Sequence, residues 1–537
     1  MADAAPVLAI DNLTLALPRL ADRAHAVRGL SLAIRPGETL CVVGESGSGK
    51  SMTAHAVMGL LPGSIRPVEG SIRLAGRELL GLDETALCRV RGREIGMIFQ
   101  EPMTSLNPVM RVSEQIIETF ATHGLLDPEA RRSRMLALLD EVGLPDPAQI
   151  ARAYPHELSG GQRQRVMIAM ALALEPKLLI ADEPTTALDV TTQAQILRLI
   201  AELRRKHGTA VLFITHDFGV VTEIADRVAV LQEGLLVEEG PVREVLERPQ
   251  HAYTQRLLKA VPSLTPPPPK ALDGAPTSLA VTGLSKLYGR RGLFRRARQV
   301  QAAQDVTFAI RRGETLGLVG ESGSGKSTVG RCILRLVEPD GGAIRIGDLS
   351  IAGLSQSAFR PHRKRVQMVF QDPFASLNPR RRVGRIIAEG PIALGQNDRD
   401  AMAKAARLLE LVGLPPQAID RYPHEFSGGQ RQRIGIARAL ALEPEVLVAD
   451  EPVSALDVSV QAQILDLIRD LQGRLGLAIL FITHDLRVAA QVCDRIAVMQ
   501  RGRIVEEEAT ARLFAAPQHA YTRQLLAAVP GRGAFSV

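Results

Sequence analysis

One octapeptide, GESGSGKS, occurs twice in this chain of 537 residues, from Gly44 to Ser51 and from Gly320 to Ser327. Each copy follows an apolar stretch, ETLCVV or ETLGLV, that is typical of a buried strand. A glycine-rich loop between a strand and a helix surrounds phosphate groups with backbone N–H groups and with the positive end of the helix. Two identical loops in this setting predict two copies of one phosphate-binding domain.

A longer repeat indicates that whole domains are duplicated. Residues 154–190 align without a gap with residues 422–458, and the sequences ITHD and QHAYT recur later at the same offset. Four consecutive prolines at 266–269 favour an extended spacer between the copies, with a proline-rich recognition peptide as the alternative. We therefore predict domain 1 over residues 1–264, a linker over 265–277 and domain 2 over 278–537.

Each half has the pattern of an α/β domain with a helical insertion. Short apolar stretches such as 178–181 and 211–214 are typical of parallel strands buried on both faces. In the insertion of domain 1, Asp127 before Pro128 predicts the start of a helix and Gly143 predicts its end. The expected fold is an α/β P-loop NTPase core in each half, with a helical insertion in each.

Composition limits the other classes of protein. No uncharged apolar run approaches the roughly 18 to 20 residues of a membrane-spanning helix, and the N-terminus lacks the pattern of a secretory signal, so we expect a cytosolic chain. The four cysteines have no paired spacing and are predicted to be reduced thiols. The net charge of +7 suits nucleic acid, anionic lipid or plain solubility. Three arginine-rich runs are interpreted as solvated faces, with acidic lipid or an acidic partner as the alternative: 290–298, 360–365 and 380–385.

The residue types at and beyond the glycine loop suit nucleotide hydrolysis. In domain 1, Lys50 would reach the β- and γ-phosphates, and the hydroxyl of Ser51 would bind Mg²⁺. Asp182 ends the apolar stretch LLIAD and would lie beside that metal, and Glu183 would act as the base for the attacking water. The same residue types recur in domain 2 as Lys326, Ser327, Asp450 and Glu451.

Two more polar residues follow apolar stretches in each domain. Gln100 comes after IF, at a position that would reach Mg²⁺ and the water. His216 comes after VLFIT; a single histidine there is more often structural, but its recurrence favours a sensor of the γ-phosphate. The counterparts in domain 2 are Gln371 and His484.

The motif SGGQ, at Ser159–Gln162 and Ser427–Gln430, is a second glycine-rich anion binder at a helix start, or else a flexible cap. The motifs resemble those of the ABC ATPases, and the resemblance covers nearly the whole chain. Their order in each half is the phosphate loop, the glutamine, SGGQ, Asp-Glu, ALD (Ala187–Asp189 and Ala455–Asp457) and the histidine. The resemblance implies two tandem ABC-type nucleotide-binding domains. It also implies a head-to-tail arrangement in which the SGGQ of one domain completes the ATP site opened by the other.

The site residues implied by the motifs and the resemblance fall into three groups. The ATP-binding residues are Gly44, Glu45, Ser46, Gly47, Ser48, Gly49, Lys50, Ser51, Met52, Ser159, Gly160, Gly161 and Gln162 in domain 1, and Tyr288, Gly320, Glu321, Ser322, Gly323, Ser324, Gly325, Lys326, Ser327, Thr328, Ser427, Gly428, Gly429 and Gln430 in domain 2. The Mg²⁺ ligands are Ser51, Gln100, Asp182, Ser327, Gln371 and Asp450, and the catalytic residues are Glu183, Glu451, His216 and His484.

The segments FQEPMTSLNP and FQDPFASLNP and the duplicated QHAYT tail resemble the peptide/nickel importer ATPases, and in particular the fused Yej-type ATPase of oligopeptide and microcin C importers. The resemblance implies ATP hydrolysis at the cytoplasmic face of the bacterial inner membrane, coupled to import of oligopeptides. The implied partners are two permease subunits, which would contact Glu101–Pro108 and Asp372–Pro379, and a periplasmic peptide-binding protein. No nucleic acid is expected.

The same motifs are compatible with other functions. The same machine would serve for glutathione, dipeptides or nickel, because the cargo is chosen by subunits outside this chain. A tandem ABC protein acting on ribosomes or DNA is the alternative from another class. That class has long inter-domain arms or zinc-binding cysteine pairs, and neither is present in this sequence.

The two domains differ in one expected contact. The family stacks adenine on an aromatic residue upstream of the phosphate loop, and Tyr288 is the candidate in domain 2, ahead of Phe294. Domain 1 has no aromatic residue before Phe99. Its adenine is therefore expected to rest on an aliphatic side chain, with Leu20 and Val27 as the candidates.

Overall fold

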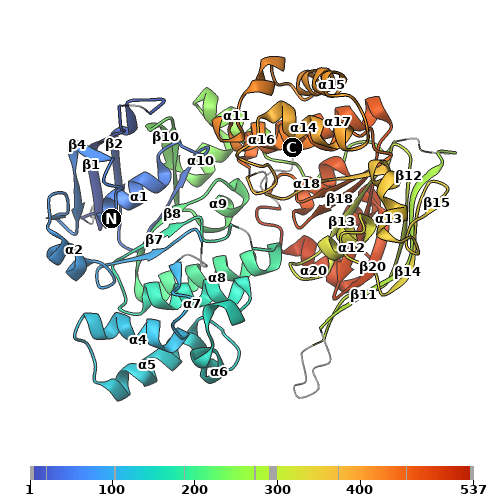
Figure 1. Cartoon of the computed structure of the whole chain (residues 1–537). Helices are drawn as coiled ribbons and strands as arrows, with labels where there is room; N and C mark the ends of the chain where they lie inside the picture. Colours follow the sequence, from blue (N-terminus) through green and yellow to red (C-terminus); the bar gives the residue numbers. More distant parts are fainter. Residues whose placement is uncertain are drawn as a thin grey trace. The chain divides into compact units, whose positions relative to one another are not determined.

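The computed structural model describes residues 5–19, 21–101, 105–186, 188–270, 272, 274–289, 299–372, 374–454 and 456–532. The chain divides into two compact units whose boundary in the sequence falls between Val261 and Pro262. In Figure 1 the first unit runs from blue to green and the second from yellow-green to red. Each unit is described by itself.

The first unit is built on two sheets. The larger has six strands in the order β10-β9-β3-β8-β7-β6, parallel except for β10. The smaller is antiparallel, in the order β2-β1-β4-β5. The strands are β1 (Leu8–Ala16), β2 (His25–Ile34), β3 (Thr39–Val43), β4 (Arg66–Leu74), β5 (Arg77–Glu78), β6 (Ile95–Ile98), β7 (Leu178–Asp182), β8 (Ala210–Ile214), β9 (Arg227–Gln232) and β10 (Leu235–Pro241).

Helices cover these sheets and form the insertion. One apolar core joins the smaller sheet, helix α1 and one face of the larger sheet. The helices are α1 (Lys50–Met58), α2 (Glu84–Val90), α4 (Val112–Thr122), α5 (Pro128–Glu141), α6 (Pro147–Arg152), α7 (Gly160–Leu172), α8 (Val190–His207), α9 (Phe218–Ile224), α10 (Val242–Glu247) and α11 (Ala252–Ala260), with a 3₁₀ turn at Pro155–Glu157.

The predicted helical insertion is confirmed by α4, α5 and α6, which lie together at the lower edge of the first unit in Figure 1. Asp127 caps α5: its carboxylate accepts the backbone N–H groups of Glu129 and Ala130. Met135 and Leu139 are buried on the inner face of α5, and Gly143 follows with φ 68°, a conformation that suits glycine after a helix end.

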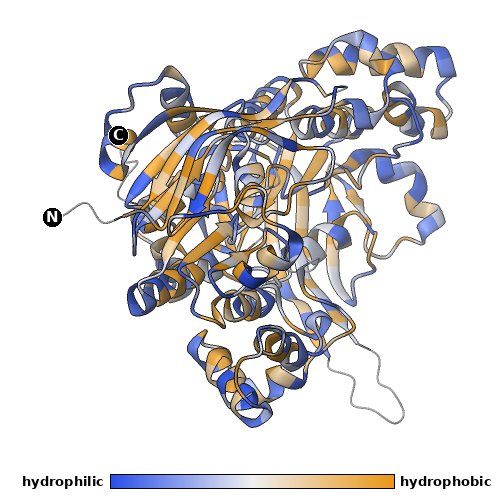
Figure 2. Ribbon diagram, turned by 90° about the vertical axis from the view of Figure 1, so that its left-hand side faces the viewer, coloured by the Kyte–Doolittle hydropathy of each residue, from blue (hydrophilic) through white to orange (hydrophobic). Residues whose placement is uncertain are grey.

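The second unit repeats both sheets with the same topology. Its larger sheet has the order β16-β17-β18-β13-β19-β20 and its smaller sheet the order β12-β11-β14-β15. Figure 2 shows apolar residues concentrated on the strands and polar residues on the outer turns of the helices. The strands are β11 (Thr277–Tyr288), β12 (Val300–Arg311), β13 (Thr315–Val319), β14 (Gly341–Ile346), β15 (Leu349–Ser350), β16 (Val366–Val369), β17 (Val446–Asp450), β18 (Ala478–Thr483), β19 (Arg495–Gln500) and β20 (Arg503–Ala509).

The helices of the second unit follow the same plan. They are α12 (Lys326–Ile333), α13 (Gln356–Phe359), α14 (Val383–Ala393), α15 (Asp398–Leu411), α16 (Gly428–Leu440), α17 (Val458–Leu475), α18 (Leu486–Val492), α19 (Thr510–Ala515) and α20 (Ala520–Ala527), with 3₁₀ turns at Arg360–Arg365, Pro416–Asp420 and Pro423–Glu425. Among the described residues, no helix combines the length and the apolar character that a membrane crossing requires.

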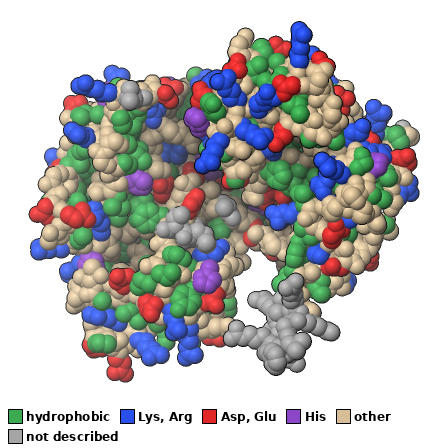
Figure 3. Space-filling model, viewed as in Figure 1, with side chains coloured by type: hydrophobic (Ala, Val, Ile, Leu, Met, Phe, Trp, Pro, Cys, Tyr) green, Lys and Arg blue, Asp and Glu red, His purple; other side chains and the backbone are tan. Residues whose placement is uncertain are grey.

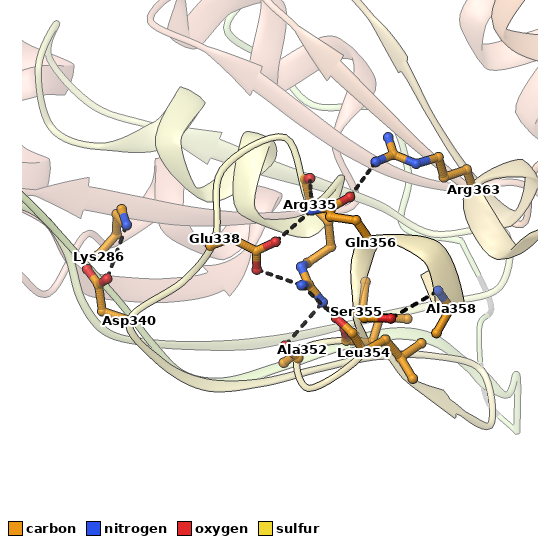
Figure 4. A network of polar contacts seen from close by, with 11 residues as sticks. Lys286, Arg335, Glu338, Asp340, Ala352, Leu354, Ser355, Gln356, Ala358 and Arg363 are labelled. Atoms are coloured by element: carbon orange, nitrogen blue, oxygen red, sulfur yellow. Dashed lines mark hydrogen bonds and ion pairs between the residues drawn. The ribbon is translucent and has the colours of Figure 1, made fainter. Parts of the chain in front are cut away.

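The turn after α12 contains a buried arginine that has no counterpart at the same place in the first unit. Arg335 has φ 52° and is 4% exposed, and its guanidinium donates to the carboxylate of Glu338 at 2.6 Å and to the carbonyl oxygens of Ala352 and Leu354 at 3.1 and 2.9 Å (Figure 4). In the first unit, α1 is instead followed by the capping residue Gly59, with φ 63°. The two equivalent helices, α1 and α12, therefore end in different ways: a glycine follows the first, and a buried arginine lies in the turn after the second.

The proline-rich segment is attached to the second unit. The side-chain amide of Gln491 donates to the carbonyl oxygens of Ser263 and Thr265, at 2.7 and 3.0 Å. Lys270 donates to Gln472 and forms an ion pair with Asp494 at 3.3 Å. Part of the spacer is therefore held against this unit by polar contacts.

Two of the arginine-rich runs are paired with carboxylates. Arg365 contacts Glu445 at 2.6 Å, and Arg381 contacts Glu389 at 2.8 Å. Figure 3 shows basic and acidic side chains interspersed over the visible face. These contacts add intramolecular partners to the predicted solvated faces, and the run at 290–298 lies outside the described residues.

Candidate functional site

The first phosphate loop connects β3 to α1 through a series of left-handed glycines. Gly44 has φ 151°, and a Cβ there would lie 2.2 Å from the carbonyl oxygen of Leu231 on β9. Gly49 has φ 102°, and its Cβ would lie 2.7 Å from the carbonyl oxygen of Ala26. Side chains are excluded at these two positions because neighbouring backbone occupies the space. The second loop repeats both features at Gly320 and Gly325.

The lysine of each loop folds back over its own loop. Lys50 Nζ donates to the carbonyl oxygens of Gly44 and Glu45 at 2.7 and 2.9 Å. Lys326 makes the equivalent contacts at 2.7 and 2.8 Å. Burial lowers the pKa of Lys326, and the carboxylates of Glu451 and Asp450 oppose this effect. Each loop thus holds a buried amino group against its own first two carbonyl oxygens.

The loop serine and the strand-end aspartate are in direct contact in both units. Ser51 Oγ donates to Asp182 Oδ1 at 3.0 Å, and Ser327 Oγ donates to Asp450 Oδ1 at 3.0 Å. Burial raises the pKa of Asp182, and the hydrogen bond from Ser51 opposes that shift. A hydroxyl and a carboxylate are hard oxygen ligands of the kind that Mg²⁺ binds. In the first unit both line a cavity of about 500 Å³, together with Gln100 and His55, so the residues present fit this ion.

The glutamate after each strand-end aspartate has a strained backbone. Glu183 and Glu451 have φ 46° and 47°, a left-handed conformation that is costly for residues other than glycine. The N–H of Glu183 donates to the carbonyl oxygen of Ile214 at 2.9 Å, and this bond holds the turn. The chain therefore leaves β7 sharply at Asp182 and aims the two consecutive carboxylates differently.

Three polar side chains converge on the Glu183 carboxylate. His216 Nδ1 lies 3.1 Å from Oε1, and Gln100 Nε2 and Thr186 Oγ1 each donate to Oε2 at 3.0 Å. In the second unit, His484 Nδ1 lies 3.1 Å from Glu451 Oε1 and Gln371 Nε2 donates to Oε2 at 2.8 Å. In both units the structure thus brings the predicted catalytic glutamate and histidine together with the glutamine that was predicted as a Mg²⁺ ligand.

These contacts set the protonation state of the glutamates. Burial alone would raise the pKa of Glu183, but the hydrogen bond and charge of His216 outweigh it and lower the pKa to about 2. Glu451 is shifted in the same direction for the same reasons. Burial would lower the pKa of His484, and the contact with Glu451 raises it overall. Each glutamate is therefore ionised at neutral pH.

The SGGQ motifs start helices α7 and α16 with reciprocal caps. Ser159 Oγ accepts the N–H of Gln162 at 3.3 Å, and Gln162 Oε1 accepts the N–H of Ser159 at 2.9 Å. Ser427 and Gln430 repeat the arrangement at 3.4 and 3.0 Å. The capping fixes the helix start, and Ser159 and Ser427 remain at the surface.

The residues predicted to contact adenine differ in their exposure to solvent. Tyr288 ends β11 and is 40% exposed, with Lys286 Nζ 5.6 Å from the ring centroid. Val27 is wrong as a platform because its side chain is fully buried on β2. Leu20 and Phe294 lie outside the described residues. The equivalent of Tyr288 by strand register is Leu17, whose N–H donates to the carbonyl oxygen of Ala24 at 2.9 Å.

Two contacts with the phosphate loop were not predicted. The guanidinium of Arg23 donates to the carbonyl oxygen of Gly47, so the hairpin between β1 and β2 reaches the loop. The hydroxyl of Tyr253 accepts the N–H of Glu45 at 3.1 Å, 208 residues away in the sequence. The repetition of QHAYT was the only sequence signal that could have marked this tyrosine.

Comparison with known proteins agrees with this geometry. The profile of the ABC transporter family matches residues 27–186 and 303–454, which include both phosphate loops and both Asp-Glu pairs. The chain belongs to the ABC transporter family. Each unit is thus an ATP-binding cassette, and the predicted tandem ABC fold and ATPase class are confirmed. The profile of the oligopeptide/dipeptide transporter C-terminal region matches residues 237–292 and 505–534.

Two similar proteins match this chain over nearly its whole length. The glutathione import ATP-binding protein GsiA of Shigella dysenteriae is 49% identical, over 98% of this chain and 90% of its own. The peptidoglycan transport ATP-binding protein YejF of Agrobacterium fabrum is 49% identical, over 97% of this chain and 96% of its own. Among solved structures, the dimeric MJ0796 bacterial ABC transporter cassette is 31% identical, with a TM-score of 0.40, over 44% of this chain and 99% of that chain.

Proposed function

We propose that this chain is the ATP-hydrolysing subunit of an importer for small peptides. The observation that carries the proposal is the duplicated site, in which serine meets aspartate at 3.0 Å and histidine meets glutamate at 3.1 Å in each cassette. The two tail regions that match oligopeptide/dipeptide transporters support the choice of cargo class. The relatives named for glutathione and peptidoglycan transport make glutathione, itself a tripeptide, a candidate alongside longer oligopeptides, dipeptides and nickel.

In each cassette the chain's own groups would divide the work of hydrolysis. In the first, Lys50 would exchange its loop carbonyl partners for the β- and γ-phosphates of ATP. Ser51 and Asp182, with Gln100, would hold Mg²⁺, which neutralises phosphate charge when bound. The ionised Glu183 would accept a proton from the attacking water. His216 would hold the Glu183 carboxylate in place, and its other ring N–H would contact the γ-phosphate. Lys326, Ser327, Asp450, Gln371, Glu451 and His484 would do the same in the second cassette.

The two SGGQ motifs support a shared use of the two cassettes. Each motif begins a helix with its serine at the surface and a capped, ordered first turn, which suits an anion from outside the helix. We propose that Ser159–Gln162 would act on ATP held by Lys326, and Ser427–Gln430 on ATP held by Lys50. ATP binding would then draw the cassettes together and hydrolysis would release them.

The segments after Gln100 and Gln371 are the proposed contacts with two permease subunits. Their described residues leave large apolar side chains in solvent: Phe374 is 60% exposed, and Val109, just past the first segment, is 79% exposed. Each site thus offers one exposed apolar side chain to a protein contact. Pro102, Met103, Thr104 and Pro373 lie outside the described residues. A chain docked in this way would lie at the cytoplasmic face of the inner membrane, with a periplasmic peptide-binding protein on the other side.

Reconstitution tests the function directly. The chain would be co-expressed with the permease subunits encoded by neighbouring genes, and the complex would be purified. It would then be reconstituted with the binding protein in proteoliposomes containing ATP. Uptake of a labelled tripeptide should require ATP and should fail with Glu183→Gln plus Glu451→Gln. ATP hydrolysis without uptake of any tested peptide, glutathione or nickel would contradict the import assignment. Cysteine cross-links to the permeases from Ser105 or Phe374 would support the docking segments, whereas cross-links from the tails alone would contradict them.

A further inference from the structure

The tail of the first cassette ends in a short helix whose tyrosine reaches the phosphate loop. Tyr253 lies in the first turn of α11 and is 3% exposed. Its hydroxyl accepts the N–H of Glu45 at 3.1 Å and donates to Glu45 Oε2 at 3.3 Å. One tail hydroxyl thus contacts both the backbone and the side chain of the second residue of the loop.

The second cassette makes the same contact. Tyr521, in the first turn of α20, is 4% exposed, and its hydroxyl accepts the N–H of Glu321 at 3.1 Å. Burial raises the pKa of Tyr521 to about 12, so the hydroxyl keeps its proton at physiological pH. The contact joins residues 200 apart in this cassette and 208 apart in the first, so it has persisted through differences in length between the two copies.

The position of the tyrosine depends on how the tail docks. In the first cassette, the carboxylate of Glu238 on β10 accepts the N–H groups of Gln250 and His251 at 2.7 and 3.1 Å. The ring nitrogen Nδ1 of His251 accepts the N–H of Tyr253 at 3.3 Å and caps α11. Leu257, one turn on, is buried. These contacts fix the helix start, and the helix start fixes the hydroxyl.

The peptide groups at the start of the loop are held from two sides. The carbonyl oxygens of Gly44 and Glu45 accept from Lys50, while the N–H of Glu45 donates to Tyr253. If Lys50 turned to phosphate, its bonds to the two carbonyl oxygens would be lost. The tyrosine bond would then hold the start of the loop together with the N–H of Ser48, which donates to the carbonyl oxygen of Glu45 at 3.1 Å.

We propose that Tyr253 and Tyr521 are positioning residues of the two phosphate loops, through which docking of each tail sets the nucleotide affinity of its own cassette. The proposal rests on the proposed function and adds a regulation of the same site. Coupling of two binding events is reciprocal, so ATP in a cassette should also tighten the docking of its tail. A partner that binds the tail would then change ATP affinity without touching the nucleotide.

The test removes the hydroxyl and keeps the ring. Tyr253→Phe would be compared with the parent in the full-length chain carrying Lys326→Ala, so that equilibrium binding of ATP with Mg²⁺ reports the first site. Because one hydrogen bond to the loop is lost, the dissociation constant should rise about two- to tenfold. In the otherwise unmodified chain, the KM for ATP should rise while kcat changes little. Amide exchange in residues 252–260 should slow on ATP addition in the parent and less so in Tyr253→Phe.

Controls separate positioning from folding. Lys259→Ala, on the exposed face of the same helix, should bind ATP like the parent. Leu257→Ala loosens the docking by another route and should weaken ATP binding in the same direction as Tyr253→Phe. Parent-like ATP affinity in both Tyr253→Phe and Leu257→Ala, with or without a lower unfolding temperature, would overturn the proposal. Absence of ATP hydrolysis by the parent would instead contradict the proposed function.

Discussion

His484 Nδ1 lies 3.1 Å from Glu451 Oε1, and this contact raises the pKa of the histidine and lowers that of the glutamate. A raised folded-state pKa stabilises the protein below the ordinary histidine value of 6.5 and loses that effect as the pH rises through the folded-state value. A lowered carboxylate pKa stabilises it above the ordinary value of 4.5 and loses the effect as the pH falls. The pair therefore contributes most between these two values.

The first prediction is a pH-dependent stability difference. In nucleotide-free protein, the parent should unfold at a higher temperature than Glu451→Gln near pH 6, and the gap should shrink as the pH rises through the raised pKa of His484. Thermal unfolding of both proteins from pH 6 to 9 measures it. His424→Gln replaces a histidine that lies away from this carboxylate and serves as the control. When it is added to both proteins, the difference in unfolding temperature between the parent and Glu451→Gln should not change. A gap that widens with rising pH would contradict the assignment.

The second prediction concerns the base for water. Glu183 is ionised, with a pKa of about 2, and glutamine keeps its shape but cannot accept the proton. Glu183→Gln plus Glu451→Gln should lower kcat for ATP by about 10²- to 10⁴-fold and leave ATP bound. ATPase assays and nucleotide retention on gel filtration measure this. Each single substitution should lower the rate, and parent-like turnover in either one would show that its site does not hydrolyse ATP.

Much of this site was predictable because strand ends in a parallel sheet meet at one edge. Ser51 and Asp182 are 131 residues apart, yet an apolar strand before each placed them together, and the contact at 3.0 Å follows. The pairing of Gln100 with Glu183 was not foreseen in detail. Both were expected near the metal and water, but which polar group each side chain would contact depends on rotamers that no sequence pattern specifies.

Other features depend on tertiary paths that local patterns do not encode. Val27 was wrong because an irregularity in the pairing of β1 with β2, between Leu13 and Leu15, breaks the alternation and leaves Val27 buried. The register of the two strands identifies Leu17 as the counterpart of Tyr288. Tyr253 was noticed only as part of a repeated tail. Its contact with Glu45 requires α11 to return across the unit, and periodicity carries no information on that path.

The third prediction compares the two nucleotide sites. Tyr288 offers an exposed ring where the first cassette has Leu17, and an aromatic stack contributes on the order of 0.5–1.5 kcal/mol beyond area burial. The Lys326 site should therefore bind ATP roughly two- to tenfold more tightly than the Lys50 site. Affinity at each site is measured with the other disabled by Lys50→Ala or Lys326→Ala.

Two substitutions sharpen that comparison. Tyr288→Ala should remove most of the difference without changing the Lys50 site, and Leu17→Tyr should tighten the Lys50 site. Equal affinities in the parent, or no effect of either change, would show that the first cassette has another platform for adenine. Arg23, which already contacts the carbonyl oxygen of Gly47, is the residue to replace next in that case.

The fourth prediction concerns the buried arginine after α12. Arg335→Ala should lower the free energy of unfolding of the second cassette by on the order of 1–3 kcal/mol, because the carbonyl oxygens of Ala352 and Leu354 lose a charged donor. Arg335→Gly should cost less than Arg335→Ala, since glycine tolerates φ 52°. Urea unfolding measures both. A larger loss for glycine than for alanine would mean that backbone strain is not relieved at this turn.

The contacts of Ser263, Thr265 and Lys270 with the second cassette change what the proline-rich segment can do as a tether. A free chain of about 16 residues would reach roughly 50 Å when fully extended. Gln491, Gln472 and Asp494 hold these residues against the second cassette. While these contacts persist, the flexible part of the linker is limited to the residues before Ser263. The effective concentration of one cassette near the other is then governed by how often those few polar bonds break. Expressed as two separate polypeptides, the halves would lose this effective concentration, and the segment would remain bound only if it stayed with the second half.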